Sequence, residues 1–231
     1  MLDHVFEKME RRILFRFTLL GNEFEVGNTI FVTWIVMAIL IALAAVLTRN
    51  MSVKRPGKPQ AVVEMLVQAV ANISKQSVGH HWKAFFPYLG TLLLFICLSN
   101  IIALFNFIPG LHIYPPTKDI NVTAPLAVSS ILVVLYAGFR YKGAKGWARG
   151  LASPLPFMVP FKLLEYGVRP LSLSLRLFGN IVAGFVIMEL LISFIPLVSA
   201  PFSIYFDLFD GVLQAYIFVY LTSLYIGEAV E

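Results

Sequence analysis

The sequence predicts an all-α protein that crosses a membrane about five times. Of its 231 residues, 58% are hydrophobic and only 13% are charged, and the mean hydropathy is +0.80, which lies far above the range of soluble domains. Apolar runs of membrane-spanning length alternate with short segments rich in Lys, Arg, Pro and Gly. Two of the later runs also carry polar residues at helical spacing, which a purely lipid-facing helix would avoid.

The segment 1–28 is too polar to enter the membrane, because charged residues recur along it from Asp3 to Glu25. A cleaved signal peptide would have a short apolar region much closer to its start. We therefore expect an extracytoplasmic amino-terminal segment, followed by a first span that is retained.

Three spans and one surface helix are expected in the first 140 residues. The range 29–48 is long enough to cross about 30 Å of hydrocarbon. After a basic, proline-containing loop, apolar residues of the range 60–82 recur opposite polar ones, which is typical of a helix lying in the membrane surface. The ranges 85–107 and 122–139 are predicted to be the second and third spans.

The distribution of Lys and Arg predicts the orientation. The loops after the first and third spans hold four such residues each: Arg49, Lys54, Arg55 and Lys58 in one, and Arg140, Lys142, Lys145 and Arg149 in the other. The loop after the second span holds Lys118 alone. Since basic loops stay in the cytoplasm, the amino terminus is expected outside and the carboxyl terminus inside the cell.

A long helical hairpin is predicted at the carboxyl-terminal end, from the ranges 155–195 and 202–227. As one continuous helix, the first range would be roughly 60 Å long, which is twice the thickness of the hydrocarbon layer. The helix must therefore be strongly inclined or bend at Pro170, which removes one backbone hydrogen bond.

A polar stripe runs along the first helix of this hairpin. At 100° per residue, its members lie within about 40° of Arg176; they are Glu165, Arg169, Ser172, Arg176 and Asn180. An arginine at the centre of a bilayer costs roughly 2.5 to 3.5 kcal/mol on insertion scales. The stripe must therefore face water, a partner or an opposite charge.

The second helix of the hairpin carries a stripe of its own, formed by Ser203, Asp207, Asp210 and Gln214. Because the helices are neighbours in the chain, the two stripes can face each other. Plainer interpretations stay open. Glu165 can form an ordinary ion pair with Arg169, Asp207 and Asp210 can be solvated residues at the helix mouth, and Asn180 and Gln214 can simply join the two helices.

Arginine cannot relay a proton, because its pKa exceeds 12 and it has no acceptor. What Arg176 can do is hold an ionised carboxylate in a low dielectric and repel mobile cations. The titratable residues on either side, Glu165 toward the cytoplasm and Asp207 and Asp210 toward the outside, would then carry protons.

The sequence lacks motifs for chemistry of its own. It contains no G-x-x-x-x-G-K-[ST], no H-E-x-x-H and no G-x-S-x-G, so we expect no catalytic site, cofactor or metal centre. Nucleic acid is not an expected partner either, since the basic residues cluster in two loops. A rival prediction is a secondary transporter that binds an anionic solute through Arg169 and Arg176.

The segment Ser174-Leu-Arg176-Leu-Phe-Gly-Asn180 closely resembles the signature of subunit a of bacterial F-type ATP synthases. The similarity extends to Arg169-Pro170, to Leu213-Gln214-Ala215-Tyr216-Ile217-Phe218, and to the size of the chain and the order of its spans. The resemblance implies that Arg176 is the essential arginine that faces the ring of c subunits. It also implies that Asn180 and Gln214 are polar positions near that arginine.

The resemblance further implies a non-catalytic subunit of the bacterial cell membrane, which guides H⁺ through two offset half-channels. Its implied partners are the c-subunit ring, the b-subunit peripheral stalk, the remaining synthase subunits and membrane lipid. The chain departs from some members of the family at two positions: Phe185 replaces a glutamate, and Asp207 replaces a histidine. We therefore assign the outer proton relay to Asp207, with Asp210 as its helper.

Overall fold

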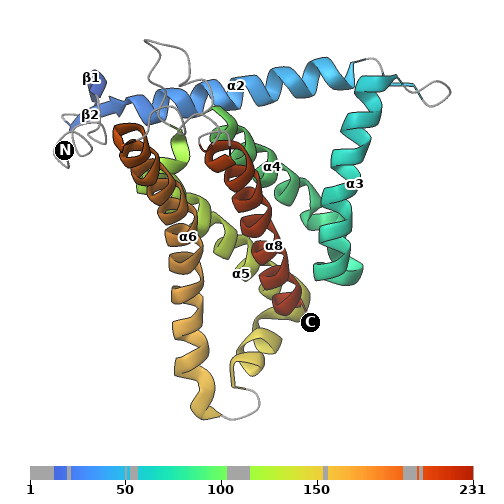
Figure 1. The fold of residues 1–231 in the computed structure, drawn as a ribbon. Coiled ribbons are helices and arrows are strands. Elements are labelled where there is room, and N and C mark those ends of the chain that lie inside the picture. Colours follow the sequence, from blue (N-terminus) through green and yellow to red (C-terminus); the bar gives the residue numbers. More distant parts are fainter. Residues whose placement is uncertain are drawn as a thin grey trace.

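The computed structural model describes residues 13–19, 22–49, 51–52, 57–102, 115–152, 156–194, 202 and 205–230. Within these residues, five helical segments are long and apolar enough to cross a membrane (Figure 1). They are Asn28–Thr48, Lys58–Ile101, Ile120–Trp147, Val159–Met188 and Leu208–Val230. The predicted all-α, polytopic fold class is therefore confirmed.

A small antiparallel β-hairpin precedes the helices, and the sequence analysis did not predict it. Its strands are β1 (Ile13–Leu19) and β2 (Asn22–Gly27), and Phe17 pairs with Phe24 in the ladder. Aromatic and polar residues alternate along β1 with the period of two that is typical of strands. The hairpin leads directly into the first helix, so it lies within the segment predicted to be extracytoplasmic.

The first helix, α2 (Asn28–Thr48), occupies the predicted first span and is largely exposed. It has no amphipathic face. Only Val32 and Val36 are buried, in a small cluster with Ile102. Such a uniformly apolar and exposed surface is what lipid contact favours over packing against the rest of the chain.

The next helix, α3 (Lys58–Val78), lies where the surface helix is predicted. It starts with Pro59 in its first turn and ends at Gly79, whose positive φ of 66° is a backbone conformation that favours glycine. A short 3₁₀ turn, Gly79–His81, connects it to α4 (Trp82–Ile101), the second predicted span. The predicted end of that span, 103–107, lies outside the described residues.

Helix α5 (Ile120–Ala152) is longer than the predicted third span, because the basic segment after residue 139 is helical. The prediction of a Gly-rich loop there was wrong. The direction of the helix changes at Gly143, whose φ is 69°. The part beyond Gly143 folds back so that Trp147 contacts Phe139 and Tyr166, with ring centroids 4.6 Å and 6.1 Å away.

The carboxyl-terminal hairpin consists of α6 (Val159–Phe194), a π-helical turn (Tyr205–Asp210) and α8 (Gly211–Val230). A 3₁₀ turn, Pro156–Met158, precedes α6. Helix α6 continues through Pro170 without a break. The predicted α-helix from residue 202 begins instead as a wider π-helical turn, so the regular 100° spacing assumed for Asp207 and Asp210 does not hold there.

The long helices of the chain run in different directions. In Figure 1, α2 lies across the direction of α3, α6 and α8. With 1.5 Å of rise per residue, α6 is about 54 Å long and exceeds the hydrocarbon thickness. The inclination of the hairpin to the membrane stays a prediction from the sequence.

The core forms where α3, α4, α5, α6 and α8 meet. Its most deeply buried side chains include Leu89, Ile96, Val134, Leu173, Leu177, Phe218 and Ile226. Small residues bring the helices close together, as is usual in lipid, where the hydrophobic effect contributes little to helix association. A Cβ atom on Gly211 would lie 2.8 Å from Cβ of Asn100, and one on Gly227 would lie 1.9 Å from the backbone oxygen of Ser77. Helix α8 is therefore tightly fixed at both ends.

Candidate functional site

The polar stripe of α6 borders the protein core. On the helical wheel, the buried residues Leu173 and Leu177 lie about 60° to 100° from Arg176 on one side. The exposed residues Leu171 and Leu175 lie about 100° to 140° away on the other side. The stripe therefore marks the boundary between the face that packs against α5 and an apolar face that is open to lipid or to another chain.

Arg176 is exposed on α6, within a segment long and apolar enough to span a membrane. Among the residues that the structure describes, it forms no hydrogen bond or ion pair. Leaving such a charge uncompensated next to lipid is costly. An acidic group from outside this chain would remove that cost.

Arg169, seven residues earlier on the same stripe, is compensated by two carboxylates. Its Nη2 atom donates to Oε1 of Glu165 at 2.5 Å and to Oε2 of Glu228 at 2.6 Å. The guanidinium carbon also lies 4.4 Å from the centroid of the Tyr225 ring, which adds a cation–π contact. The plain i,i+4 ion pair considered for Glu165 is therefore present, and Glu228 joins it from α8.

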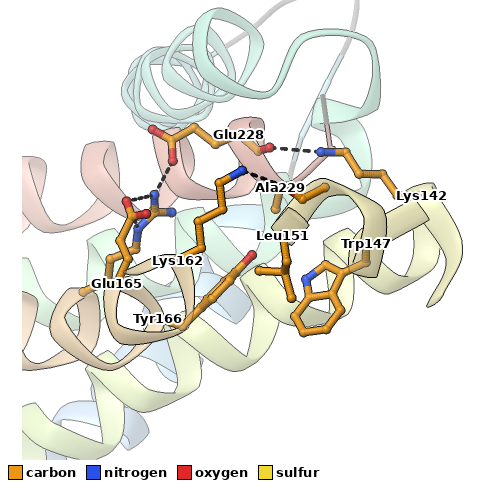
Figure 2. A pocket seen from close by; sticks show the side chains of 10 residues that line it. Lys142, Trp147, Leu151, Lys162, Glu165, Tyr166, Glu228 and Ala229 are labelled. Carbon is orange, nitrogen blue, oxygen red and sulfur yellow. Dashed lines mark hydrogen bonds and ion pairs between the residues drawn. The ribbon is translucent and has the colours of Figure 1, made fainter. Parts of the chain in front are cut away.

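A pocket of about 220 Å³ lies beside this ion-pair cluster (Figure 2). It is lined by Lys142, Trp147, Gly150, Leu151, Lys162, Glu165, Tyr166, Arg169, Glu228 and Ala229. Nζ of Lys162 donates to the backbone oxygen of Gly150 at 2.7 Å, and Nζ of Lys142 donates to that of Glu228 at 3.4 Å. Charged groups thus surround a space that is large enough for several water molecules.

On the other side of Arg176, Asn180 joins α6 to α8. Its Nδ2 atom donates to Oε1 of Gln214 at 2.8 Å. Gln214 is completely buried, and its Nε2 atom has no hydrogen-bond partner among the described residues. The predicted adjacency of the two stripes is thus found at this position.

The two aspartates of the second stripe lie in the π-helical turn. Asp210 is half-buried at the end of the turn and directly precedes Gly211. The side chain of Asp207 lies outside the described residues. Single π-helical turns often occur at functional sites, because the wider helix redirects the side chains that follow it.

Sequence reasoning missed a buried polar network between α4, the 3₁₀ turn Pro116–Lys118 and α8. Nδ2 of Asn100 donates to the backbone oxygen of Gly211 at 2.8 Å, and Oγ1 of Thr117 donates to Oδ1 of Asn100 at 2.6 Å. Nearby, the hydroxyl groups of Thr123 and Ser174 lie 3.4 Å apart. Asn100 lies near the end of α4, and Thr117 lies in the short 3₁₀ turn. The sequence around each residue therefore predicted only that a helix ends there.

Glu228 was missed as well, although the sequence held a signal for it. It lies one residue beyond the predicted last helix, yet 14 residues after Gln214 it falls within about 40° of the same helical face. Phe185, where some relatives have a glutamate, lies against Lys118, with Nζ 3.7 Å from the ring centroid. In this chain, a cation therefore lies near that position.

In the described part of the chain, Glu165 and Glu228 lie on one side of Arg176 and the Asn180–Gln214 pair lies on the other, so polar groups flank a cation that has no partner among these residues. Comparison with known proteins shows the family of the chain. The family model described as ATP synthase A chain matches residues 30–227. A relative from Propionigenium modestum, ATP synthase subunit a, sodium ion specific, is 38% identical over 219 residues, covering 90% of this chain and 75% of the relative.

Proposed function

The chain belongs to the ATP synthase A chain family, and we propose that it is the ion-conducting stator subunit of the membrane sector of an F-type ATP synthase. In this role it passes ions to and from carboxylates on a partner ring of c subunits. The observation that carries the proposal is the exposed Arg176, which forms no hydrogen bond or ion pair with the described residues and lies in a helix long and apolar enough to span a membrane.

The proposed outer route passes Asp207 and Asp210 and reaches the Asn180–Gln214 pair. The unpartnered amide nitrogen of the buried Gln214 supports this route, since buried donors are normally satisfied by protein or water. An ion arriving here neutralises the carboxylate of a c subunit. Only the neutral form can then move through lipid, because moving the charged form would be prohibitive.

The proposed inner route begins at the pocket beside Glu165. The pocket and the ion-pair cluster around Arg169 supply polar groups on the opposite side of Arg176 from Asn180. Glu165 precedes Arg176 by 11 residues, or about 16 Å of helix rise. A ring carboxylate that has completed its rotation releases its ion into this route and leaves as an anion.

Arg176 separates the two routes. Its permanent positive charge repels a cation that would pass directly between them, and it attracts the ring carboxylate once that group is ionised. Ions must therefore take the rotary path. The membrane potential supplies about 2.3 kcal/mol per charge per 100 mV, which the stator converts into torque.

We propose H⁺ as the transported ion, a multi-pass location in the bacterial cell membrane, and an orientation with the amino terminus outside. The peripheral stalk of b subunits is the proposed partner that holds this chain against rotation. The relative from Propionigenium modestum is described as sodium ion specific, so the ion is a separate question. ATP-driven acidification of inverted vesicles without added Na⁺ is the expected result; an absolute requirement for Na⁺ would contradict H⁺ as the ion.

The decisive experiment replaces Arg176 with alanine in the whole complex. Because one preorganised charge of this kind is worth about 10²- to 10³-fold in rate, we expect ATP synthesis by energised vesicles to fall at least about a hundredfold. Arg176→Lys serves as the matched control that keeps a charge. Normal synthesis in an assembled Arg176→Ala complex would refute the stator function, and loss of solute uptake instead would favour a secondary transporter.

A further inference from the structure

Among the described residues, two polar bridges connect α6 to α8, one on each side of Arg176. The first is the Asn180–Gln214 hydrogen bond of 2.8 Å, and the second is the Arg169–Glu228 ion pair of 2.6 Å. Elsewhere α6 packs mainly against α5. Arg176 lies four residues from the first bridge and seven from the second, so these two contacts fix its position relative to α8.

Glu228 is held at a rigid point of the molecule. The preceding residue, Gly227, contacts α3 so closely that an added Cβ atom would lie 1.9 Å from the backbone oxygen of Ser77. The backbone oxygen of Glu228 also accepts a hydrogen bond from Lys142 on α5 (Figure 2). The carboxylate of Glu228 therefore extends from a fixed helix end toward α6.

The two carboxylates that bind Arg169 are not equivalent. Glu165 belongs to α6 itself, so its ion pair with Arg169 stabilises that helix but cannot place it relative to its neighbours. Glu228 belongs to α8, so its ion pair connects two helices. The side chain of Arg169 is only 16% exposed, whereas those of Glu165 and Glu228 are 53% and 48% exposed, so solvent partly screens both pairs.

We propose that Glu228 is a positioning residue for ion translocation: through Arg169, it holds α6 at the height and rotation that present Arg176 to the partner ring. This inference rests on the proposed stator function. Without Glu228, Arg169 keeps its partner on α6, but the bridge to α8 is lost. Helix α6 can then move relative to α8, and the distance between Arg176 and the ring carboxylate is no longer fixed.

The test measures ATP-driven H⁺ pumping per ATP hydrolysed in inverted vesicles that contain the whole complex. Because the bridge to α8 is lost while Arg169 keeps its partner Glu165, we expect Glu228→Ala to lower this ratio by about three- to tenfold, which corresponds to about 0.7–1.4 kcal/mol. Glu228→Gln keeps the size of the side chain without its charge and should resemble alanine. Glu228→Asp keeps the charge and should recover a substantial part of the ratio. The matched control is Glu64→Ala, which removes an exposed glutamate on α3.

A double variant distinguishes positioning through Arg169 from a direct role of Glu228. If Glu228 acts through Arg169, the variant Arg169→Ala/Glu228→Ala should pump no worse than Arg169→Ala alone. Additive losses would overturn the inference. Wild-type pumping in Glu228→Gln would overturn it too. Immunoblots of subunit content identify any variant that fails to assemble. If Glu228→Ala fails to assemble, Glu228→Gln and Glu228→Asp test the inference in its place.

A chemical cross-link provides an independent rescue. In a Cys97→Ser background, cysteines at positions 169 and 228 can be joined by a short bifunctional thiol reagent, which restores the connection between the helices without either charge. Recovery of pumping after cross-linking supports positioning, whereas no recovery at complete cross-linking contradicts it. If Arg176→Ala pumps normally, the stator function itself fails. If only Arg176→Ala is defective and the Glu228 variants are normal, the present inference alone fails.

Discussion

Arg169 and Arg176 lie on the same face of the same helix, yet their surroundings differ completely. Arg169 binds two carboxylates and lies against the ring of Tyr225. Arg176 is exposed and has no such partner among the described residues. The difference begins in the sequence, since the residue four positions earlier is Glu165 in one case and Ser172 in the other.

Arg169 therefore has a structural role, whereas we propose a functional role for Arg176. Compensating Arg169 within the chain lowers the cost of placing it in the membrane and connects α6 to α8. Leaving Arg176 uncompensated keeps that cost in the isolated chain, so the charge remains available to a partner. Arg169 therefore connects the two helices, whereas in the proposed function Arg176 acts on the partner ring.

The difference between the compensated Arg169 and the exposed Arg176 can be removed by giving Arg176 a carboxylate partner on its own helix. Ser172→Glu places a glutamate four residues before Arg176, in the geometry of Glu165 and Arg169. Because a neutralised cation no longer attracts the ring carboxylate or repels mobile cations, ATP-driven pumping should fall at least about tenfold.

The control for this variant is Ser172→Gln, which has nearly the same size and no charge. It should retain most of the pumping activity. Equal losses in both variants would show that bulk at position 172, rather than compensation of Arg176, causes the defect.

A smaller effect is expected when the polar bridge next to Arg176 is removed. Gln214→Leu keeps a side chain of similar volume but deletes the hydrogen bond with Asn180. A hydrogen bond of this kind contributes about 1 kcal/mol, which corresponds to about a fivefold loss in the rate of ATP synthesis. Gln214→Glu, which retains an acceptor, should be less defective; a variant Gln214→Leu with normal synthesis would exclude this bridge from the outer route.

The smallest effect is expected at Glu165. Glu165→Gln removes one of the two carboxylates of Arg169, but the ion pair with Glu228 remains. Pairs spaced by four residues on a helix contribute about 0.2–0.5 kcal/mol, so pumping should fall by only about twofold. A loss greater than tenfold would mean that Glu165 is an obligatory relay and not one polar group beside a wet route.

The sequence predicted the all-α, polytopic fold class, because long apolar runs have few alternatives to crossing a bilayer. It also placed Arg176 and Asn180 on one stripe, since α6 keeps a regular helical period through Pro170. The ion pair between Arg169 on that stripe and Glu228 on α8 was harder to predict. Glu228 is 59 residues from Arg169, and the contact depends on how α8 is fixed against α3 at Gly227.

Other differences arise from local backbone geometry. The basic segment after residue 139 folds into a helix despite its glycines, because Gly143 adopts a positive φ that lets the chain turn and Trp147 pack against Phe139. The π-helical turn before Gly211 altered the spacing of Asp207 and Asp210. Periodicity assumes regular helices, so it cannot predict either feature.

In the proposed function, the stripe containing Arg176 faces the partner ring, and cross-linking measures this proximity directly. In a Cys97→Ser background, a cysteine is introduced at the exposed Ser172 and paired with a cysteine beside the ring carboxylate. The control places the cysteine at Leu132, which is 60% exposed on α5. If the stripe faces the ring, we expect rapid disulfide formation from position 172 and none from position 132. Disulfide formation from position 132 but not from position 172 would contradict it.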